Sequence, residues 1–599
     1  MMNPSGRADF ASNKRPPRSA EAALQSDDFS VAITGSGGSG AVTAGQILLR
    51  AAGEVGLYGL MMRSAGPQIR GGESAALLRF ARAPVACMGD RFDVLLGLDW
   101  GNAGRFAQEI PLDASTLILA DSAAGAVPQA FADSGAGVQQ LAFQERAASV
   151  EGGRLNMVAL GALAGLCGLP QQAVDAAVDS VLADKGESVV EAAIACVAIG
   201  FKLGGELAPA GGQPPVVSGE SQAERWNIDG NEACGLGALR GGVRFVAAYP
   251  ITPASGILEW LAPRLYRLGG NLVQAEDELA SINMVIGASF GGVPALTATS
   301  GPGLSLMQEG LGLAVASETP LVVVNVTRGG PSTGIPTKSE QSDLDSALYG
   351  MHGDAPHLVL APLDVRDCAF TTQWAVRLAE HLQTVAIVLS DQSLGQARAV
   401  TDAPRVFEQE LPRLTETQPD QHYRRYVQGE DGISPMTLPG TALGMYTADG
   451  LEHDERGTPS TLAEDHQRQL HKRRHKLEAF DYGEHWAQLR GSGELCLLCW
   501  GSTSGAVFEA AERLRERGVA VRVVALRLLA PLRADALRQA LQGVKVLWVV
   551  EQNHTGQLCH YLKSQDVLPV APQLLARPGP VPLRPGEIVS IVSESEGSP

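Results

Sequence analysis

The residues best suited to chemistry gather in one stretch of the chain, residues 243–334. An apolar run from Val243 to Ala248 leads into residues 249–253, which read Tyr-Pro-Ile-Thr-Pro. The run predicts a buried strand, and the two prolines end it. Thr252 is expected to be the N-cap of the following helix, with Pro253 at its first position. A hydroxyl and free backbone N–H groups at such a helix start predict a site for a carboxylate or a phosphate.

Three further motifs follow in the same stretch. They are the acidic residues 276–278 before an apolar helix, the Gly/Ser/Thr loop 297–303, and the loop 328–334 that starts with Arg328. Each motif follows a predicted strand, and open α/β sheets bind their ligands at the carboxyl ends of their strands. A carboxylate, a hydroxyl, two loops of small residues and an arginine are therefore expected at one edge of a sheet.

These four motifs, in this order, resemble the 2-oxoacid:ferredoxin oxidoreductases. The resemblance is greatest to the α subunit of the 2-oxoglutarate enzymes, in the form with the γ domain fused in front, and it covers nearly the whole chain. It implies coenzyme A-dependent oxidative decarboxylation of 2-oxoglutarate to succinyl-CoA and CO2, with electrons passed to ferredoxin, in a reversible reaction. It also implies that Thr252 and Arg328 bind the substrate and that Thr299, Ser300 and Gly301 bind the cofactor.

Two segments bear on the choice of 2-oxoacid. Residues 337–344 and 350–353 are similar to the 2-oxoglutarate branch of the family, although Met351 stands where members often have arginine. Ala254 stands where serine is common, which removes one hydroxyl. No residue of the sequence shows how long the substrate is, so pyruvate or another 2-oxoacid is the alternative substrate.

The resemblance also implies thiamine diphosphate, a cofactor that needs a carboxylate against its aminopyrimidine ring. Glu278, at the start of an apolar helix, is the candidate for this catalytic and cofactor-binding carboxylate; the alternative is an acidic residue that only meets the helix dipole. The sequence has neither the Gly-Asp-Gly motif of a Mg2+–diphosphate site nor the cysteine sets of an iron–sulfur cluster. Thiamine diphosphate is thus expected to be shared with a β subunit that holds Mg2+ and a [4Fe-4S] cluster, in an α2β2 assembly. No metal site is expected in this chain.

The first domain carries a second candidate binding loop. A predicted strand at 30–34, the glycine-rich loop 35–40 and an Ala/Leu-rich helix follow in the order of a dinucleotide-binding motif. The candidate cofactor-binding residues of this loop are Gly35, Gly37, Gly38 and Gly40. The loop is either a phosphate cradle at a helix N-terminus or a tight turn that binds nothing.

Two arginines, Arg63 and Arg70, flank the Gly/Pro loop that follows and suit it to anions. Because Arg63, and no acid, ends the predicted strand before this loop, NAD is disfavoured and NADP stays open. The resemblance implies instead that this γ-type domain packs on the catalytic domain and helps to form the coenzyme A side of the site. It implies this role for Arg63 and Arg70.

The expected fold class is α/β and multidomain. A Rossmann-like γ domain precedes a transketolase-like thiamine diphosphate-binding domain of the pyrimidine side and a transketolase C-terminal-like domain. The expected boundaries are a disordered tail at 1–27, the γ domain at 28–205, a linker at 206–229, the catalytic domain at 230–400, a connecting segment at 401–488, the C-terminal-like domain at 489–575 and a tail at 576–599.

The connecting segment holds a basic helix with His466, His471 and His475. Its lysines and arginines disfavour a cation site, so the helix is predicted to present a solvated face. Cys496 and Cys499 lie on a predicted apolar strand and are expected to be buried structural residues.

Composition narrows the classes of protein. The chain has 599 residues, a net charge of −18 and 45% apolar residues, which fits several soluble globular domains and disfavours nucleic acid or anionic membranes as partners. Scattered cysteines and no signal peptide predict a cytoplasmic protein. Two other classes stay open: a nicotinamide-dependent dehydrogenase built on the first domain, and a non-catalytic scaffold that kept the fold.

Overall fold

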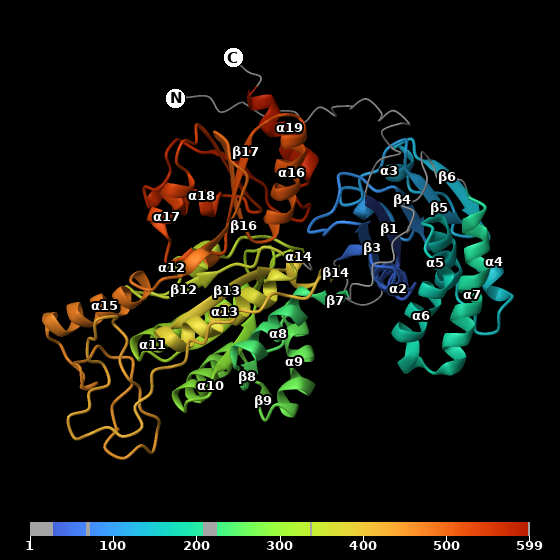
Figure 1. Ribbon diagram of the computed structural model, residues 1–599. Coiled ribbons are helices and arrows are strands. Elements are labelled where there is room, and N and C mark those ends of the chain that lie inside the picture. The colour runs from blue at the N-terminus through green and yellow to red at the C-terminus, as the bar shows by residue number, and fades with distance from the viewer. Residues whose placement is uncertain (1–27, 67–71, 208–224, 336–337, 597–599) are drawn as a thin grey trace.

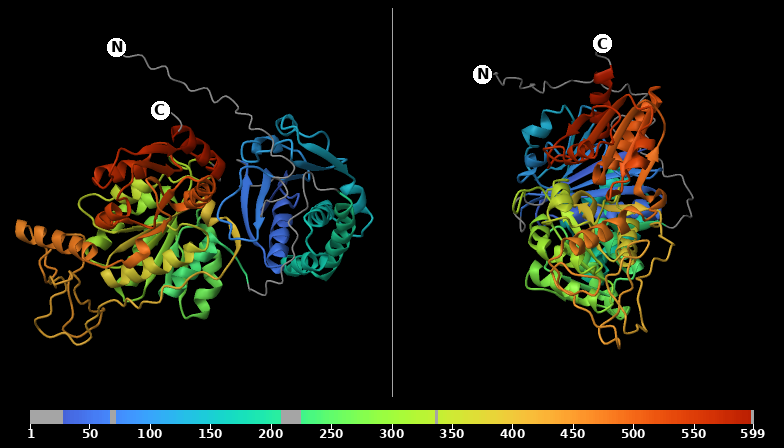
Figure 2. Two further views of the ribbon diagram at one scale, coloured as in Figure 1. Left: turned by 45° about the horizontal axis from the view of Figure 1, so that its top comes forward. Right: turned by 90° about the vertical axis from the view of Figure 1, so that its left-hand side faces the viewer.

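The computed structural model describes residues 28–66, 72–207, 225–335 and 338–596. The expected tail at 1–27, Arg70, most of the expected linker and Thr337 lie outside the described residues. Three sheets, of eight, seven and five strands, organise the described part of the chain (Figure 1). The first sheet lies to one side, and the other two are stacked beside it (Figure 2).

The first sheet has the strand order β6-β5-β4-β1-β3-β2-β14-β7. Its strands are β1 (Asp28–Ser36), β2 (Tyr58–Ala65), β3 (Glu73–Ala81), β4 (Val94–Gly97), β5 (Leu117–Asp121), β6 (Gly137–Leu141), β7 (Trp226–Asp229) and β14 (Arg398–Thr401). β1, β4, β5 and β6 run parallel, whereas β3 lies between β1 and β2 and runs antiparallel to both. The strand that ends near Arg63 is therefore not the parallel neighbour that a nicotinamide-binding motif requires.

Helices cover this sheet and pack closely on one another. They are α2 (Ala41–Glu54), α3 (Gln129–Ala132), α4 (Phe143–Ala148), α5 (Leu155–Leu166), α6 (Gln171–Leu182) and α7 (Glu187–Gly205), with short 3-10 turns η1 (Ala103–Phe106) and η2 (Ala183–Lys185). α5 and α7 approach so closely that a Cβ at Gly161 or Gly200 would overlap the backbone of the other helix. By length and composition α7 could also cross a membrane, but the core helices of folded domains pass the same test, and α7 packs against α5 and α6.

The central sheet has the order β18-β12-β13-β11-β10-β8-β9, and all of its strands run parallel except β18. Its strands are β8 (Phe245–Ala248), β9 (Asn271–Gln274), β10 (Ala295–Thr299), β11 (Leu321–Thr327), β12 (Leu358–Leu360), β13 (Val385–Asp391) and β18 (Leu528–Ala530). Its helices are α8 (Gly230–Gly241), α9 (Ser255–Arg267), α10 (Glu278–Phe290), α11 (Gly301–Ala316), α12 (Leu344–Tyr349), α13 (Asp367–Leu382) and α14 (Gln392–Gly395). The expected α/β class with a parallel sheet is confirmed.

The last sheet has the order β15-β17-β16-β19-β20. Its elements are β15 (Ala487–Arg490), β16 (Leu495–Trp500), β17 (Val521–Leu526), β19 (Val546–Glu551), β20 (Gln573–Ala576), α16 (Ser504–Glu516), α17 (Ala534–Ala540), α18 (Gln557–Ser564), η3 (Gly483–Trp486) and η4 (Gly501–Thr503). Cys496 and Cys499 are buried on β16, as expected. All eight cysteines fall in described residues, and none forms a disulfide.

The expected disordered tail after residue 576 is wrong for most of its length. Residues Pro585–Glu596 form helix α19, whose Ile588, Val589 and Val592 are buried against the last domain. Its three buried apolar residues follow the spacing i, i+1, i+4, which covers little more than one helical turn. Composition alone therefore does not distinguish this helix from a polar tail. Packing on α16 stabilises the helix.

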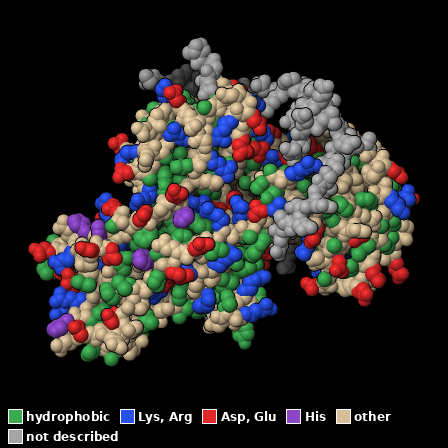
Figure 3. Space-filling view, in the orientation of Figure 1, with side chains coloured by type: hydrophobic (Ala, Val, Ile, Leu, Met, Phe, Trp, Pro, Cys, Tyr) green, Lys and Arg blue, Asp and Glu red, His purple; other side chains and the backbone are tan. Residues whose placement is uncertain are grey.

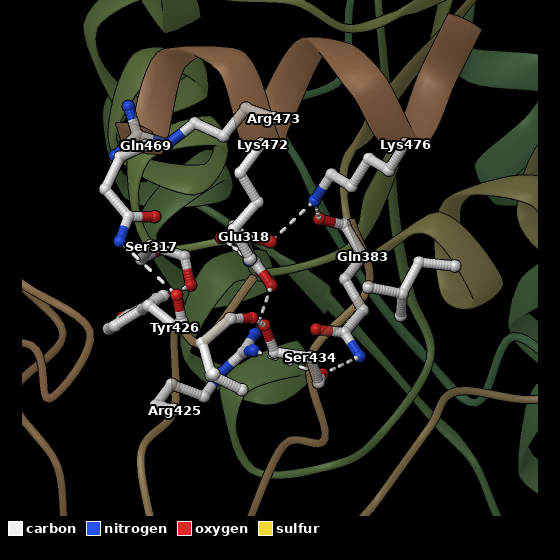
Figure 4. A network of polar contacts seen from close by, with 12 residues as sticks. Ser317, Glu318, Gln383, Arg425, Tyr426, Ser434, Gln469, Lys472, Arg473 and Lys476 are labelled. Atoms are coloured by element: carbon white, nitrogen blue, oxygen red, sulfur yellow. Dashed lines mark hydrogen bonds and ion pairs between the residues drawn. The ribbon is translucent and has the colours of Figure 1, made fainter. Parts of the chain in front are cut away.

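The segment 402–462 and helix α15 (Ala463–Glu478) form an arm that projects from the central sheet (Figures 1 and 2). Acidic, basic and histidine side chains are interspersed on its surface (Figure 3). One face of α15 is not solvated as predicted, because Lys472 and Lys476 are buried and both donate to the carboxylate of Glu318. Arg425 donates to the backbone oxygen of Glu318 at 3.0 Å (Figure 4).

Electrostatics explain how these charges are tolerated in the core. The cations Lys472, Lys476 and Arg425 hold the pKa of Glu318 far below its usual range. Burial lowers the pKa of Lys472 to about 7, opposed by the attraction to Glu318. The network fastens the arm to the turn after α11.

Candidate active site

The carboxyl ends of β8, β9, β10 and β11 meet at one edge of the central sheet, because these strands are parallel and lie in the order β11-β10-β8-β9. Thr252 follows β8, Glu278 follows β9, and Arg328 follows β11. Ser300 and Gly301 follow β10 in the centre. The sequence motifs therefore lie together as expected.

Thr252 does not cap a helix. α9 begins at Ser255 with Ala254 at the N-cap position, which has no side-chain hydrogen bond. The reason is local: a proline disfavours helical backbone in the residue before it, so residues 251–254 form a turn instead. Asn231 fixes this turn by donating to the backbone oxygen of Pro253 at 2.8 Å. The Thr252 side chain is exposed and makes no hydrogen bond to any residue in the described ranges.

Arg328 joins the loop after β11 to the loop after β8. Its Nη1 donates to the backbone oxygen of Thr252 at 2.7 Å, across the end of β10. Its Nε is enclosed and has no partner among the described residues. The guanidinium thus uses one donor to stay in place and keeps others for an anion.

Glu278 is the first residue of α10 and is buried, with 6% of its surface exposed. The neighbouring Asp277 caps the helix by accepting from Ala280 N at 2.7 Å, so Glu278 is not needed as a cap. A Cβ added at Gly303 would lie 2.7 Å from Glu278 Oε1 and would also overlap Thr299 Oγ1. The Glu278 carboxylate therefore lies against the first turn of α11, and no described side chain pairs with it.

A second carboxylate, Asp343, approaches the same turn from the other side. Asn325 Nδ2 donates to Asp343 Oδ2 at 2.8 Å and to Thr327 Oγ1 at 3.1 Å. A Cβ added at Gly301 would lie 2.8 Å from both carboxylate oxygens of Asp343. Burial raises the pKa of Asp343, whereas hydrogen bonds from Asn325 and Thr327 and the charge of Arg328 lower it.

Sequence reasoning assigned no role to Asp343 or Asn325. The available signal was Asn325 itself, the one amide in the otherwise apolar or hydroxyl-bearing strand 321–327. A polar side chain in a fully buried strand requires a partner.

Several buried polar atoms around the N-terminus of α11 have no partner among the described residues. They are Thr297 Oγ1, Ser300 Oγ, Asn325 Oδ1 and Ser342 Oγ. Buried polar groups in folded proteins are nearly always hydrogen-bonded. Together with the unpaired Glu278 carboxylate, they suit a polar cofactor that binds at this edge.

A pocket of about 560 Å³, open solvent included, lies between the three sheets. Its lining includes Arg63, Lys338 and Arg584. Lys338 Nζ donates to Ser64 Oγ at 2.6 Å and to Glu109 Oε1 at 2.5 Å, and burial lowers the pKa of Arg584 to about 10. The pocket therefore combines three cationic side chains, of which Lys338 is paired with Glu109, with an apolar lining that includes Met62 and Leu77.

The glycine loop 35–40 does not line this pocket. The carboxylate of Asp99 accepts from the backbone N and from the hydroxyl of Ser36, each at 2.8 Å. Gly38 and Gly40 have φ of 92° and 85°, which favour glycine. The Asp99 carboxylate thus already accepts from the Ser36 backbone N–H, a donor that a phosphate bound in this loop would need.

Three family models match successive parts of the chain. Residues 30–203 match pyruvate ferredoxin/flavodoxin oxidoreductase, residues 236–472 match the thiamine diphosphate-binding part of pyruvate flavodoxin/ferredoxin oxidoreductase, and residues 484–568 match the C-terminal domain of transketolase. The 2-oxoglutarate synthase subunit KorA of Methanothermobacter thermautotrophicus is 35% identical over 378 residues, which are 62% of this chain and 98% of that protein. The chain belongs to the 2-oxoacid:ferredoxin oxidoreductase family.

Other members of the family agree with this assignment. The KorA subunit of Methanocaldococcus jannaschii is 37% identical over 352 residues, 57% of this chain and 93% of that protein. The solved 2-oxoglutarate:ferredoxin oxidoreductase from Magnetococcus marinus, described with 2-oxoglutarate, coenzyme A and succinyl-CoA bound, superposes with a TM-score of 0.87 at 34% identity. That comparison covers 95% of this chain and 100% of the other.

The family assignment decides between the classes of protein that the sequence left open, which were a nicotinamide-dependent dehydrogenase and a non-catalytic scaffold. It accounts for all three sheets, whereas a nicotinamide dehydrogenase would leave the second and third without a role. The resemblance stated from the sequence motifs is confirmed, and the chain is an oxidoreductase subunit with a thiamine diphosphate-binding region. A non-catalytic scaffold is not supported.

Proposed function

We propose that the chain is the α subunit of a 2-oxoglutarate:ferredoxin oxidoreductase. It would convert 2-oxoglutarate and coenzyme A to succinyl-CoA and CO2, reversibly, and pass electrons to ferredoxin. The observation that carries the proposal is the convergence of Glu278, Thr252, Arg328 and the α11 N-terminus at one sheet edge. The names of the relatives and the ligands of the solved member support the choice of substrate.

Pyruvate or another 2-oxoacid is the second candidate. Met351 is buried and uncharged, so this position offers no cation for a second substrate carboxylate. A distal carboxylate would then need a cation from elsewhere in the assembly. Comparison of 2-oxoglutarate with pyruvate as substrates of the same preparation distinguishes the two.

The residues present fit thiamine diphosphate. When bound, this cofactor supplies a carbanion that attacks the 2-oxo carbon. Glu278 would accept or donate the proton at the aminopyrimidine ring, in an environment that the first turn of α11 shields from water. Thr299, Ser300 and Gly301 would lie along the cofactor, and the unpartnered Ser300 Oγ would gain a hydrogen bond.

Thr252 and Arg328 would hold the C1 carboxylate of the substrate. The hydrogen bond from Arg328 to the backbone oxygen of Thr252 holds these two residues together. It leaves the exposed Thr252 hydroxyl and the other guanidinium donors of Arg328 free to bind the substrate. A charge-assisted, forked donor suits a carboxylate. Arg328 thereby orients the bond that breaks when CO2 leaves.

The cationic pocket between the sheets is the place that we assign to coenzyme A, whose phosphates are anionic. Arg63, from the sequence prediction, would act there with Lys338 and Arg584. The glycine loop with Gly35, Gly37, Gly38 and Gly40 stays a prediction, and the Asp99 carboxylate beside it favours the tight-turn alternative.

The assembly is the remaining part of the proposal. A β subunit would bring Mg2+ and a [4Fe-4S] cluster and complete the thiamine diphosphate site in an α2β2 enzyme. Eight unpaired cysteines are consistent with a reducing cytoplasm.

Co-expression with a β-type chain, followed by co-purification, mass analysis and metal analysis, tests this function. The chain alone should be colourless and free of thiamine diphosphate, and the pair should be brown and active with 2-oxoglutarate, coenzyme A and ferredoxin. A coloured, cofactor-loaded single chain would contradict the proposal.

A further inference from the structure

We propose that Asp343 is a positioning residue that compensates the charge of Arg328 and so limits how tightly the C1 carboxylate of the substrate is held. This inference rests on the proposed function and extends it. It assigns a role to a carboxylate that the proposed chemistry does not use.

The placement of Asp343 follows from strand β11. Asn325 points from this strand to Asp343 Oδ2 at 2.8 Å, and Arg328 begins the loop directly after the same strand. The strand is fully buried and runs between β10 and β13. One rigid element thus carries the residue that holds the acid and the residue whose charge the acid offsets.

Two carboxylates bracket the first turn of α11. Glu278 lies against Gly303, and Asp343 lies against Gly301, which stands two residues earlier. Only a residue without a side chain fits at either place. The positive end of the α11 dipole favours negative charge here, so the turn supports Asp343 as an anion.

The chemistry gives a reason for this countercharge. The C1 carboxylate is an anion in the bound substrate and leaves as neutral CO2, while the electron pair of the broken bond stays with the former 2-oxo carbon. A strong, uncompensated cation would therefore stabilise the bound substrate more than the transition state and slow the reaction. A neighbouring carboxylate reduces this ground-state stabilisation and keeps the orientation that Arg328 provides.

A purely structural role for Asp343 predicts a different outcome. If the side chain only holds the loop 338–343 on the sheet, its loss loosens the site, raises KM and lowers the melting temperature. If it offsets Arg328, its neutralisation tightens substrate binding and lowers kcat. The two roles move KM in opposite directions.

The experiment uses the enzyme purified with its partner chain and compares wild type, Asp343→Asn and Asp345→Asn. Asp345 is two residues away and exposed, and its substitution removes the same charge outside the site. We expect Asp343→Asn to lower KM for 2-oxoglutarate and kcat, each about three- to tenfold, because a nearby unit charge is removed from a partly dry site. Asp345→Asn should change neither.

A binding measurement gives a readout that needs no turnover. Glutarate carries the carboxylates but no 2-oxo group, so its dissociation constant, measured by calorimetry on the same preparations, should fall by a similar factor in Asp343→Asn. Should the amide not be tolerated, Asp343→Ser removes the charge with a smaller side chain, and the melting temperature shows which variant folds.

The outcomes separate the inference from the proposed function. Wild-type enzyme without turnover of any 2-oxoacid overturns the proposed function and the inference with it. Active wild type overturns the inference alone if the neutral variants have a raised or unchanged KM and a raised or unchanged dissociation constant for glutarate. Tighter glutarate binding with lower kcat supports it.

Discussion

At the residue scale, Glu278 is the group whose proton transfer the proposed reaction needs. Glu278→Gln keeps the shape of the side chain and removes the proton-accepting carboxylate. Turnover with 2-oxoglutarate should fall ~10²–10⁴-fold, the usual contribution of general acid–base catalysis. Steady-state kinetics of the complex measure this effect, and assembly should be unchanged because Asp277 caps the helix.

Glu276→Gln is the matched control, since Glu276 is exposed in the same acidic motif. It should leave turnover near normal. Normal turnover of Glu278→Gln with a defective Glu276→Gln would place the catalytic carboxylate two residues earlier.

Thr252 and Arg328 give a second prediction at this scale. Thr252→Ala and Arg328→Lys should each lower kcat/KM for 2-oxoglutarate about tenfold or more, because each loses a contact to the substrate carboxylate worth ~1.5–3 kcal/mol. Lysine cannot both donate to the Thr252 carbonyl and present a fork to the substrate.

The melting temperature of both variants should stay close to that of wild type. Thr252 caps no helix, so its loss does not carry the stability cost of a missing cap. Thr333→Ala, an exposed change in the loop after Arg328, is the control and should have normal kinetics. Unaltered kcat/KM in Thr252→Ala and Arg328→Lys would remove both residues from the site.

At the element scale, the arm depends on the buried charges that join α15 to the turn after α11. Glu318→Gln leaves Lys472, Lys476 and Arg425 without an anion in the core and should destabilise the protein by ~3–5 kcal/mol. Lys472→Met removes one of three cations and fills its space, so it should be nearly neutral or stabilising. Chemical denaturation of the purified chain measures both effects.

The exposed ion pair Arg474–Glu478 on the same helix is the control, with an N–O distance of 2.6 Å. Arg474→Met should change stability by less than ~1 kcal/mol, because solvent screens exposed pairs. Equal effects of Glu318→Gln and Arg474→Met would show that the network does not hold the arm.

At the scale of the whole molecule, the first domain is joined to the rest of the protein by a shared sheet and by an ion pair, as well as by the connecting chain. β14 pairs antiparallel with β2, from Arg398 opposite Met61 to Val400 opposite Gly59, so one sheet includes strands from both parts. Arg79 donates to Glu509 of the last domain at 2.6 Å. We expect a protease site inserted within 208–224 and then cut to leave two fragments that elute together.

Size-exclusion chromatography after cleavage tests this expectation. A variant with Arg79→Glu, which repels Glu509, should separate more readily as salt or denaturant is added. Separation of the cleaved wild-type fragments in mild buffer would contradict a continuous sheet as the main connection.

The order and type of the local motifs were determined by the sequence alone. Turn-forming prolines, small residues after apolar runs and the acidic start of α10 depend on short-range geometry, so their position at strand ends could be predicted. Parallel strands then bring such ends to one edge, whatever the details of packing. The position of Glu278, Thr252 and Arg328 at one edge of the sheet was predicted in this way.

The tertiary structure alone decided which charges are buried and which partners they have. Lys472 and Glu318 are 154 residues apart in the chain, and the basic helix pattern gives no sign that one face is enclosed. Asp343 and Asn325 likewise meet only when the loop 338–343 folds back on β11. A charge pair in the core depends on long-range packing, which local sequence patterns do not encode.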